Sequence, residues 1–255
     1  MTDHVTLSVK GSIATITLDR PDKKNALSQA MWQRIPAIFA KAQEEGARAV
    51  ILTGAGGSFA AGADISEFET VYATPESAAA YSADIAQAMD AVAGCALPVI
   101  AQVEGACVGG GCGLALASDL RFAATNAKFA ITPSKLGLVY SLNDTKRLVD
   151  AVGFSRAKDI LFSGRLIKAD EALAIGLVDE LVDNVQAAVE TYVHSMVANS
   201  GFSLRTTKEI IGQISAGQMA DDDKTLGLFL SAFEGQDFKE GYKAFLEKRK
   251  PGFSG

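Results

Sequence analysis

Two glycine-rich segments offer main-chain N–H groups in a pattern that suits catalysis. Residues 53–64 read TGAGGSFAAGAD, and residues 104–113 read EGACVGGGCG. The second segment runs into residues 114–117, an apolar stretch that suits a helix. The N-terminus of a helix carries unpaired N–H donors and the positive end of the helix dipole. Such a place stabilises negative charge that develops on an oxygen atom.

Three interpretations of these glycines stay open at this point. A dinucleotide fingerprint needs G-x-G-x-x-G within a βαβ unit, with an acid about twenty residues further on. Neither segment has that spacing cleanly, and a phosphate loop of the G-x-x-x-x-G-K-[ST] kind is absent from the sequence. The third interpretation is that the glycines only permit tight turns and close helix packing. Two clusters after successive apolar runs favour a functional role.

Alternating strands and helices must position these segments. Residues 5–9 and 13–18 alternate at period two and predict a hairpin, whereas 49–53 and 98–103 are nearly continuous apolar runs typical of strands covered on both faces. Helical spacing occupies 27–42 and 75–92. The class is therefore α/β.

The second half of the chain changes to helices. Strands are expected at 120–123 and 129–131, followed by helical patterns at 144–152, 155–162 and 169–175. From Val185 onward the pattern is only helical, and apolar residues between Leu226 and Phe233 repeat every three or four positions. We expect an α/β core over residues 1–195 and a helical C-terminal region over 196–255, rather than two independent domains.

Composition excludes several classes of protein. The 24 Lys and Arg residues against 30 Asp and Glu residues give a net charge of −6, which disfavours nucleic acid or anionic lipid as a partner. The three cysteines form no CxxC pair, so neither a disulfide framework nor a metal site is expected. The apolar stretch at 91–116 contains Pro98, Gln102 and Glu104, which argues against a membrane span. Residues 1–10 have no leader pattern, so we expect a cytoplasmic protein.

Short motifs follow one another in a fixed order along the chain. They are Arg20-Pro21, Asn25-Ala26-Leu27, residues 51–54 and 59–65, Gly105 with residues 109–111, and Ser118-Asp119, with further motifs at 164–165, 172–178 and 240–249. In order and spacing they resemble the enoyl-CoA hydratase/isomerase (crotonase) superfamily from about Val5 to Phe253. The resemblance implies a crotonase-like spiral of ββα units, an acyl-CoA thioester as substrate in fatty acid metabolism, and a homotrimer or a dimer of trimers.

The resemblance also implies a catalytic site made of main chain. In this family two backbone N–H groups hold the thioester oxygen, and the matching positions are Ala63 and Gly110. Such donors are fixed in place and stabilise an enolate as its charge develops, each typically contributing about 3 kcal/mol to lowering the barrier.

Coenzyme A is expected as part of the substrate, with no other cofactor. The resemblance places it over the loop at Lys24 and Ala26, and it places a ring and an ammonium group of a neighbouring subunit against the nucleotide. The matching substrate-binding residues are Lys24, Ala26, Ala61, Asp64, Ile65, Phe229 and Lys248. We also expect Asp64 and Asp119 to shape the backbone.

The chain departs from the family where hydration needs an acid and a base. Hydratases use two glutamates for these roles. The matching positions are Gly113 and Pro133, neither of which can transfer a proton. The ionisable residues nearby are Glu67, Glu104, Lys135, Tyr140 and Asp144.

The segment 132–141 resembles methylmalonyl-CoA decarboxylase, which also has a proline there and a tyrosine placed as Tyr140 is. Tyr140 could orient a substrate carboxylate, or it could simply pack in the acyl pocket. That decarboxylase carries histidine in place of Ala63 and glutamate in place of Gly113.

Three functions stay open. The first is an enzyme that acts through an acyl-CoA enolate as a hydratase, isomerase, decarboxylase or hydrolase. The second is a non-catalytic acyl-CoA-binding protein, and the third is an RNA-binding relative, which the negative net charge disfavours.

Overall fold

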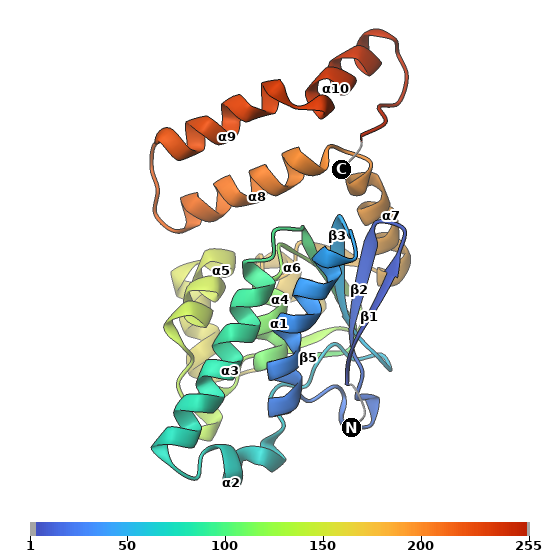
Figure 1. Cartoon of the computed structure of the whole chain (residues 1–255). Coiled ribbons are helices and arrows are strands. Elements are labelled where there is room, and N and C mark those ends of the chain that lie inside the picture. Colours follow the sequence, from blue (N-terminus) through green and yellow to red (C-terminus); the bar gives the residue numbers. More distant parts are fainter. Residues whose placement is uncertain (1–3, 254–255) are drawn as a thin grey trace.

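A computed structural model describes residues 4–253, and within that range the strands form two sheets (Figure 1). The outer limits of the two expected regions, at residues 1 and 255, lie outside the described residues. The larger sheet has the order β1-β2-β3-β4-β6-β9, in which β1 and β2 are antiparallel and the other neighbours are parallel. Its strands are β1 (Val5–Lys10), β2 (Ile13–Leu18), β3 (Ala49–Gly54), β4 (Val99–Val103), β6 (Leu120–Ala124) and β9 (Glu180–Val182). The expected hairpin and the α/β class are confirmed.

Both faces of this sheet are buried, as the continuous apolar runs predict. On one face, Val50 and Leu52 of β3 join the core beneath α1 (Gln29–Glu44) and α3 (Pro75–Ala93). On the other face, Ala49 and Ile51 pack in a second core with α7 (Val185–Val197). Alternate side chains of a strand point to opposite faces, so one short strand supplies both cores. Figure 1 shows α1 and α3 running side by side in front of the sheet.

The second sheet is small and carries the glycine-rich segment 104–113. It joins β5 (Ala106–Val108), β7 (Lys128–Ala130) and β8 (Ile167–Lys168) in that order. The sequence predicts only β7 among these strands. Strands of two or three residues are too short for their side-chain alternation to be recognised.

Helix α4 (Gly110–Ala117) begins at Gly110, earlier than the expected stretch 114–117. Glycine has a low helix propensity, which hides the first turn of this helix from a pattern-based prediction. The two predicted helices at 144–152 and 155–162 are confirmed as the two helical parts of α5 (Leu142–Ser163), which meet at a kink at Gly153, where φ is +75° and ψ is +164°. The remaining elements before α7 are α2 (Phe68–Val71), α6 (Ala169–Ala174) and short 3-10 helices.

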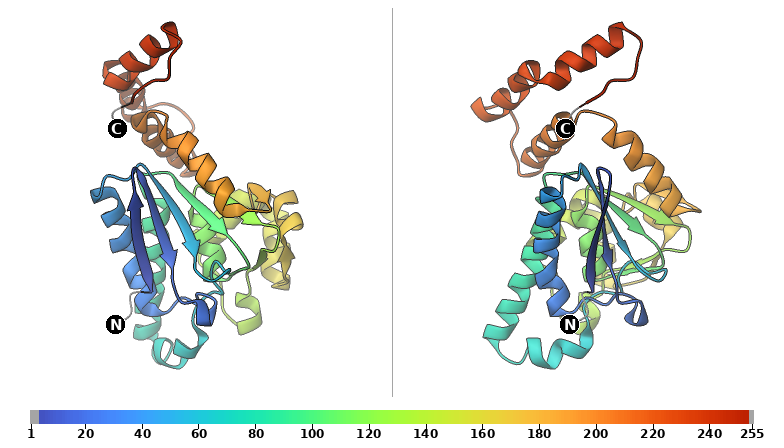
Figure 2. Two further views of the ribbon diagram at one scale, coloured as in Figure 1. Left: turned by 90° about the vertical axis from the view of Figure 1, so that its right-hand side faces the viewer. Right: turned by 45° about the vertical axis from the view of Figure 1, so that its right-hand side comes forward.

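The C-terminal region is helical, as expected. It contains α8 (Gly201–Ser215), α9 (Asp223–Glu234) and α10 (Gln236–Leu246), and Figure 2 shows α9 and α10 standing away from the sheet. Lys208 connects α8 to the α/β core, because its Nζ donates to the Leu97 carbonyl at 2.9 Å and to Asp119 Oδ2 at 2.7 Å. A boundary at residue 195 stays a prediction, because α7 runs through that position. Within residues 4–253, every helix is too short or too polar to cross a bilayer.

Candidate active site

A cavity of about 290 Å³ opens where the two glycine-rich segments meet α3 and α5. Its lining is mostly apolar, and it includes Trp32, Phe68 and Met89. The segment after β7, which contains Pro133 and Tyr140, also lines it. A concave site lined by apolar side chains with a few polar groups is the usual form of a small-molecule pocket. The structure therefore brings the glycine-rich segments and Tyr140 into one place.

One part of the cavity lining, which we call the main-chain wall, consists of residues 61–63 and 108–110. Ala60 pairs with β5, because its N–H donates to the Ala106 carbonyl and its carbonyl accepts from the Val108 N–H, both at 2.9 Å. Gly62 and Gly109 have positive φ values of +100° and +51°. A Cβ atom on Gly109 would lie 3.8 Å from the Gly62 Cα atom, so the two loops are in contact. The positive φ values favour glycine at both positions, and at position 62 a Cβ atom would also lie only 3.1 Å from the Val108 carbonyl oxygen.

The amides of Ala63 and Gly110 follow directly after these two glycines, and both residues line the cavity. Neither N–H donates to a protein acceptor among the described residues. Their neighbours are engaged: the Gly109 N–H donates to the Ala130 carbonyl at 2.8 Å, and the Asp64 N–H donates to the Leu27 carbonyl at 2.9 Å. Gly110 is also the first residue of α4, where helix N–H groups lack internal partners. Both amides are thus available to a ligand oxygen.

Trp32, which pattern-based reasoning missed, packs against Gly110. A Cβ atom on Gly110 would lie only 2.8 Å from the Trp32 Cζ2 atom. Trp32 is fully buried in α1 at the helical spacing of core residues such as Ile35. The sequence could therefore predict that Trp32 lies on the buried face of its helix, but it could not predict the contact with Gly110, which lies far away in the chain.

The place of the first hydratase glutamate is filled by other side chains. A Cβ atom on Gly113 would lie 2.6 Å from the Met89 Cε atom and 3.2 Å from the Tyr140 hydroxyl oxygen. The place of the second glutamate is Pro133, which begins a 3-10 helix (Pro133–Leu136) and lines the cavity. Neither expected glutamate position therefore carries a carboxylate, and the side chains of Met89 and Tyr140 occupy the space beside Gly113.

Tyr140 lies in the cavity lining, but its hydroxyl is already engaged. It donates to the Gly109 carbonyl at 3.2 Å. Burial raises the pKa of Tyr140 well above its ordinary value, and the nearby Cys112 and Asp144 act in the same direction. The hydroxyl therefore stays protonated at neutral pH, and it supports the loop that carries Gly110.

A second group of lining residues, which we call the side-chain wall, consists of Asp90, Ser141, Asp144 and Arg147. The Ser141 hydroxyl donates to Asp144 Oδ2 at 2.7 Å, and Arg147 Nη1 donates to Asp144 Oδ1 at 3.1 Å. Arg147 Nη2 also donates to Asp90 Oδ1 at 2.9 Å. Sequence reasoning named Asp144 but missed Arg147, although a spacing of three residues behind a serine N-cap is a readable helical pattern.

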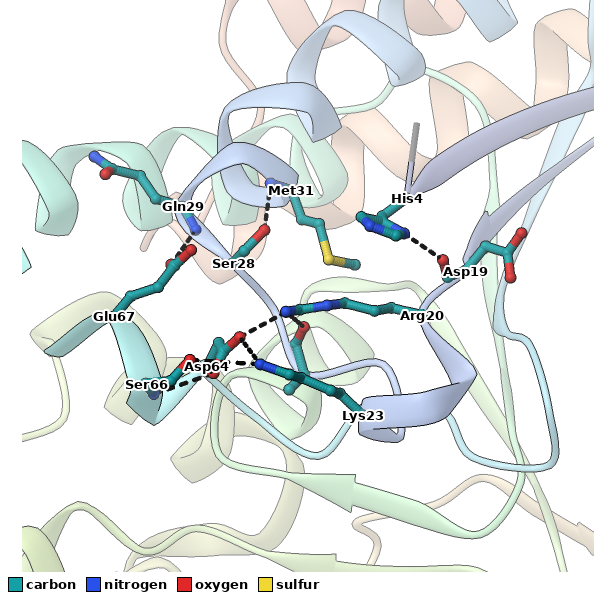
Figure 3. A network of polar contacts seen from close by, with 11 residues as sticks. His4, Asp19, Arg20, Lys23, Ser28, Gln29, Met31, Asp64, Ser66 and Glu67 are labelled. Carbon is teal, nitrogen blue, oxygen red and sulfur yellow. Dashed lines mark hydrogen bonds and ion pairs between the residues drawn. The ribbon is translucent and has the colours of Figure 1, made fainter. Parts of the chain in front are cut away.

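Asp64 sits in a polar network beneath the main-chain wall (Figure 3). Its carboxylate accepts from Arg20 Nη1 at 2.7 Å, from Lys23 Nζ at 3.2 Å and from the Ser66 hydroxyl at 2.6 Å. Burial alone would raise the pKa of Asp64, but the hydrogen bonds from Ser66, Arg20 and Lys23 together hold it well below its ordinary value. These contacts agree with the expectation that Asp64 shapes the backbone, and a role in substrate binding stays a prediction.

The expected coenzyme A residues fall into two places. Ala61 and Ile65 line the cavity. Lys24 and Ala26 lie on the adjoining loop, where the Lys24 carbonyl accepts from the Ala61 N–H at 2.9 Å and the Ala26 carbonyl accepts from Arg20 Nη1 at 3.2 Å.

Phe229 and Lys248 lie elsewhere, on α9 and just after α10, and neither lines the cavity of its own chain. The Phe229 ring packs edge-on against Phe233, with centroids 5.3 Å apart.

Comparisons with known proteins match nearly the whole chain. The family model described as enoyl-CoA hydratase/isomerase matches residues 8–255. The chain is 33% identical over 257 residues to the short-chain-enoyl-CoA hydratase of Clostridium acetobutylicum, covering 97% of this chain and 96% of that protein. It is also 33% identical over 259 residues to the crotonyl-CoA hydratase of Syntrophomonas wolfei, covering 98% of each.

Solved structures are equally similar. A crystal structure from Hyphomonas neptunium, described as an enoyl-CoA hydratase/isomerase family protein, has a TM-score of 0.97 and 46% identity, covering 100% of this chain and 98% of that one. A second, described as an enoyl-CoA hydratase/carnithine racemase from Magnetospirillum magneticum, has a TM-score of 0.94 and 35% identity, covering 100% of this chain and 96% of that one.

Proposed function

The chain belongs to the enoyl-CoA hydratase/isomerase family of acyl-CoA enzymes, and we propose that it stabilises a thioester enolate between the amides of Ala63 and Gly110. The observation that carries this proposal is that both amides line one cavity and donate to no protein acceptor among the described residues. A thioester oxygen between them accepts two hydrogen bonds. As the oxygen gains negative charge, both bonds strengthen, which lowers the barrier to enolate formation.

The reaction that follows the enolate differs from ordinary hydration. Gly113 and Pro133 supply neither a proton acceptor nor a proton donor, and Met89 fills the space beside Gly113. The side chains at these two positions therefore do not support activation of water. Reactions that need only an enolate and a proton carrier, such as double-bond isomerisation, are favoured instead.

Coenzyme A binding is proposed along the loop of Lys24 and Ala26 and past Ala61 and Ile65. The hydrogen bond from the Ala61 N–H to the Lys24 carbonyl joins this loop to the main-chain wall, which supports the proposal. Lys24 supplies positive charge for phosphate groups on a chain with net charge −6. A cytoplasmic location, and the lack of any cofactor beyond the coenzyme A of the substrate, stay predictions.

Assays against a panel of thioesters test the proposal. Purified protein is incubated with crotonyl-CoA, 3-hexenoyl-CoA and methylmalonyl-CoA. Hydration and decarboxylation products are identified by mass spectrometry, and isomerisation, which leaves the mass unchanged, is followed by the ultraviolet absorbance of the conjugated enoyl thioester. We expect conversion of 3-hexenoyl-CoA to the conjugated 2-enoyl ester with little hydration of crotonyl-CoA. Failure to convert any ester, together with failure to bind any of them, contradicts the proposal.

Two alternatives each rest on one observation. Tyr140 lines the cavity, which favours a decarboxylase-like lyase, although its hydroxyl already donates a hydrogen bond to the Gly109 carbonyl. The absence of both glutamates favours a non-catalytic acyl-CoA-binding protein. Decarboxylation of methylmalonyl-CoA supports the first alternative. Tight binding of esters without conversion, unchanged by Tyr140→Phe, supports the second.

A homotrimer or a dimer of trimers is proposed for the assembly. The support is an exposed apolar face on α9 and α10, in which Phe229, Phe233, Phe238 and Tyr242 pack ring against ring. A patch of this kind is typical of a protein interface. In such an assembly, Phe229 and Lys248 would approach the coenzyme A site of a neighbouring subunit. Light scattering tests this, and a monomer at micromolar concentration contradicts it.

A further inference from the structure

The side-chain wall contains a carboxylate that is enclosed and held in a fixed geometry. Three charged side chains line the cavity among the described residues: Asp90, Asp144 and Arg147. The Asp90 side chain is 60% exposed, whereas that of Asp144 is only 12% exposed. A guanidinium group does not act as a base in proteins. Two of the three groups, the carboxylates of Asp90 and Asp144, can accept a proton, and Asp144 is the one that the protein encloses.

Asp144 is oriented by both of its oxygens. Oδ2 accepts the Ser141 hydroxyl and Oδ1 accepts Arg147 Nη1, while the Asp144 N–H donates to the Ser141 hydroxyl oxygen at 3.1 Å. The residue lies in the first turn of α5, where the helix dipole favours a negative charge. A carboxylate has about four lone-pair sites, so acceptor capacity remains for a proton.

Asp144 lines the same cavity as the main-chain wall, and so does Tyr140. The Tyr140 hydroxyl in turn donates to the carbonyl of Gly109, the residue before the Gly110 amide. The carboxylate and the two free amides thus border the same cavity.

We propose that Asp144 is the base that removes a proton from the acyl group, taking over from the two missing glutamates. This rests on the proposed function, because the amides must hold the thioester. Asp144 takes a proton from the carbon next to the thioester carbonyl. The C–H electron pair becomes the C=C bond of the enolate, and the carbonyl π pair moves to the oxygen. For a 3-enoyl ester, return of the same proton to C4 moves the double bond into conjugation, with no other reactant consumed.

Deuterium exchange tests this assignment independently of the final reaction. Butyryl-CoA is incubated with the protein in D₂O, and uptake of deuterium at the carbon next to the carbonyl is followed by mass spectrometry. Asp144→Asn is expected to reduce exchange, and isomerisation of 3-hexenoyl-CoA, by about 100-fold or more. Asp144→Glu restores part of the rate by returning a carboxylate. The control is Asp150→Asn, on the same helix but paired with Lys146 outside the cavity, which should keep the full rate.

Ester binding is measured in parallel. Trp32 is the single tryptophan of the chain and packs beside Gly110, so its fluorescence reports occupancy of the cavity. Asp144→Asn should fold and bind butyryl-CoA as the unmodified protein does. If the unmodified protein exchanges deuterium and Asp144→Asn does so equally well, the assignment is overturned while the proposed function stands. If no ester binds, or esters bind without exchange, the proposed function falls and the assignment falls with it.

Discussion

The two walls of the cavity present different chemical groups, main-chain N–H donors in one and charged side chains in the other. The main-chain wall presents N–H groups whose positions follow from backbone conformation and from strand pairing between Ala60 and β5. The side-chain wall presents charged groups from α3 and α5 that hold one another by hydrogen bonds. Substitution of most side chains leaves the first wall intact, whereas a single substitution can change the chemistry of the second. Under the proposed function, this difference lets a chain with Gly113 and Pro133 in place of the expected glutamates keep its two main-chain donors.

The largest effect is expected at Gly110. Gly110→Pro removes the N–H donor from the main-chain wall, although proline is tolerated at the first position of a helix. Loss of one oxyanion donor typically costs about 10²- to 10³-fold in turnover. We expect that loss in the isomerisation of 3-hexenoyl-CoA, measured under substrate saturation.

Gly110→Ala is the matched control for this change. Both substitutions place a Cβ atom against Trp32, where it would lie 2.8 Å from Cζ2, but only proline removes the N–H. The alanine variant should therefore show the steric part of the effect alone. Equal turnover by the two variants would show that the Gly110 N–H has no catalytic role, which would contradict the function assigned to the main-chain wall.

The next effect concerns the support beneath the main-chain wall. Arg20→Ala leaves the buried Asp64 carboxylate without its shortest charged partner (Figure 3). Breaking a buried ion pair from one side typically costs about 3 kcal/mol of unfolding free energy. Lys23 is 44% exposed, so Lys23→Ala should cost less than about 1 kcal/mol. Urea unfolding measures both, and equal losses would contradict this account.

The same network predicts an acid dependence. Burial acts to raise the pKa of Asp64, yet its hydrogen bonds lower it overall, so the folded protein prefers the ionised form. The stabilisation is complete above the ordinary carboxylate pKa of about 4 and is lost as the pH falls toward the lowered value. Unfolding free energy should therefore fall less between about pH 6 and about pH 3 in Asp64→Asn than in the unmodified protein. An identical acid dependence in both would show that Asp64 is not responsible.

A smaller effect is expected from returning a glutamate to the site. Gly113→Glu forces its side chain against Met89, and overpacking of this kind costs about 2 kcal/mol. Met89→Ala in the same chain should recover part of the loss by making room, which urea unfolding can measure. Hydration of crotonyl-CoA should stay absent in the double variant, because Pro133 still occupies the second position. Strong hydration would show that one side chain suffices to convert the site.

The smallest effect is expected for Tyr140→Phe. The variant loses one hydrogen bond to the Gly109 carbonyl, which still accepts from the Gly113 N–H at 3.0 Å. A single neutral hydrogen bond contributes about 1 kcal/mol to stability. Turnover of 3-hexenoyl-CoA should fall by less than about tenfold, in line with that energy. A much larger loss confined to methylmalonyl-CoA would instead assign Tyr140 to the orientation of a carboxylate.

The main-chain wall was largely predictable from the sequence. The glycine clusters and the apolar runs before them predicted two strand-to-loop junctions, and the family resemblance pointed to Ala63 and Gly110. The start of α4 at Gly110 was missed, because glycines at the first turn conceal a helix. The strand β5 was missed for its length alone.

The side-chain wall was predicted poorly. Asp144 was named as ionisable, but its pairing with Arg147, three residues further along α5, was missed. The contact of Arg147 with Asp90 could not be predicted, because it depends on how α5 lies against α3. The position of Met89 beside Gly113 likewise depends on how α3 packs against α4. The pattern of apolar residues in a sequence predicts whether a segment is a helix or a strand, but it says little about which helices and strands contact one another.

The sequence separation of the contacts around the cavity has a consequence for folding. Arg20 meets Asp64 across 44 residues, and Asp90 meets Arg147 across 57. Parallel strands joined by long crossovers form such contacts late, because the chain must first pay the entropy of closing large loops. The cavity is therefore among the last features to form as the chain folds, and recovery of thioester binding during refolding should lag behind recovery of helical circular dichroism.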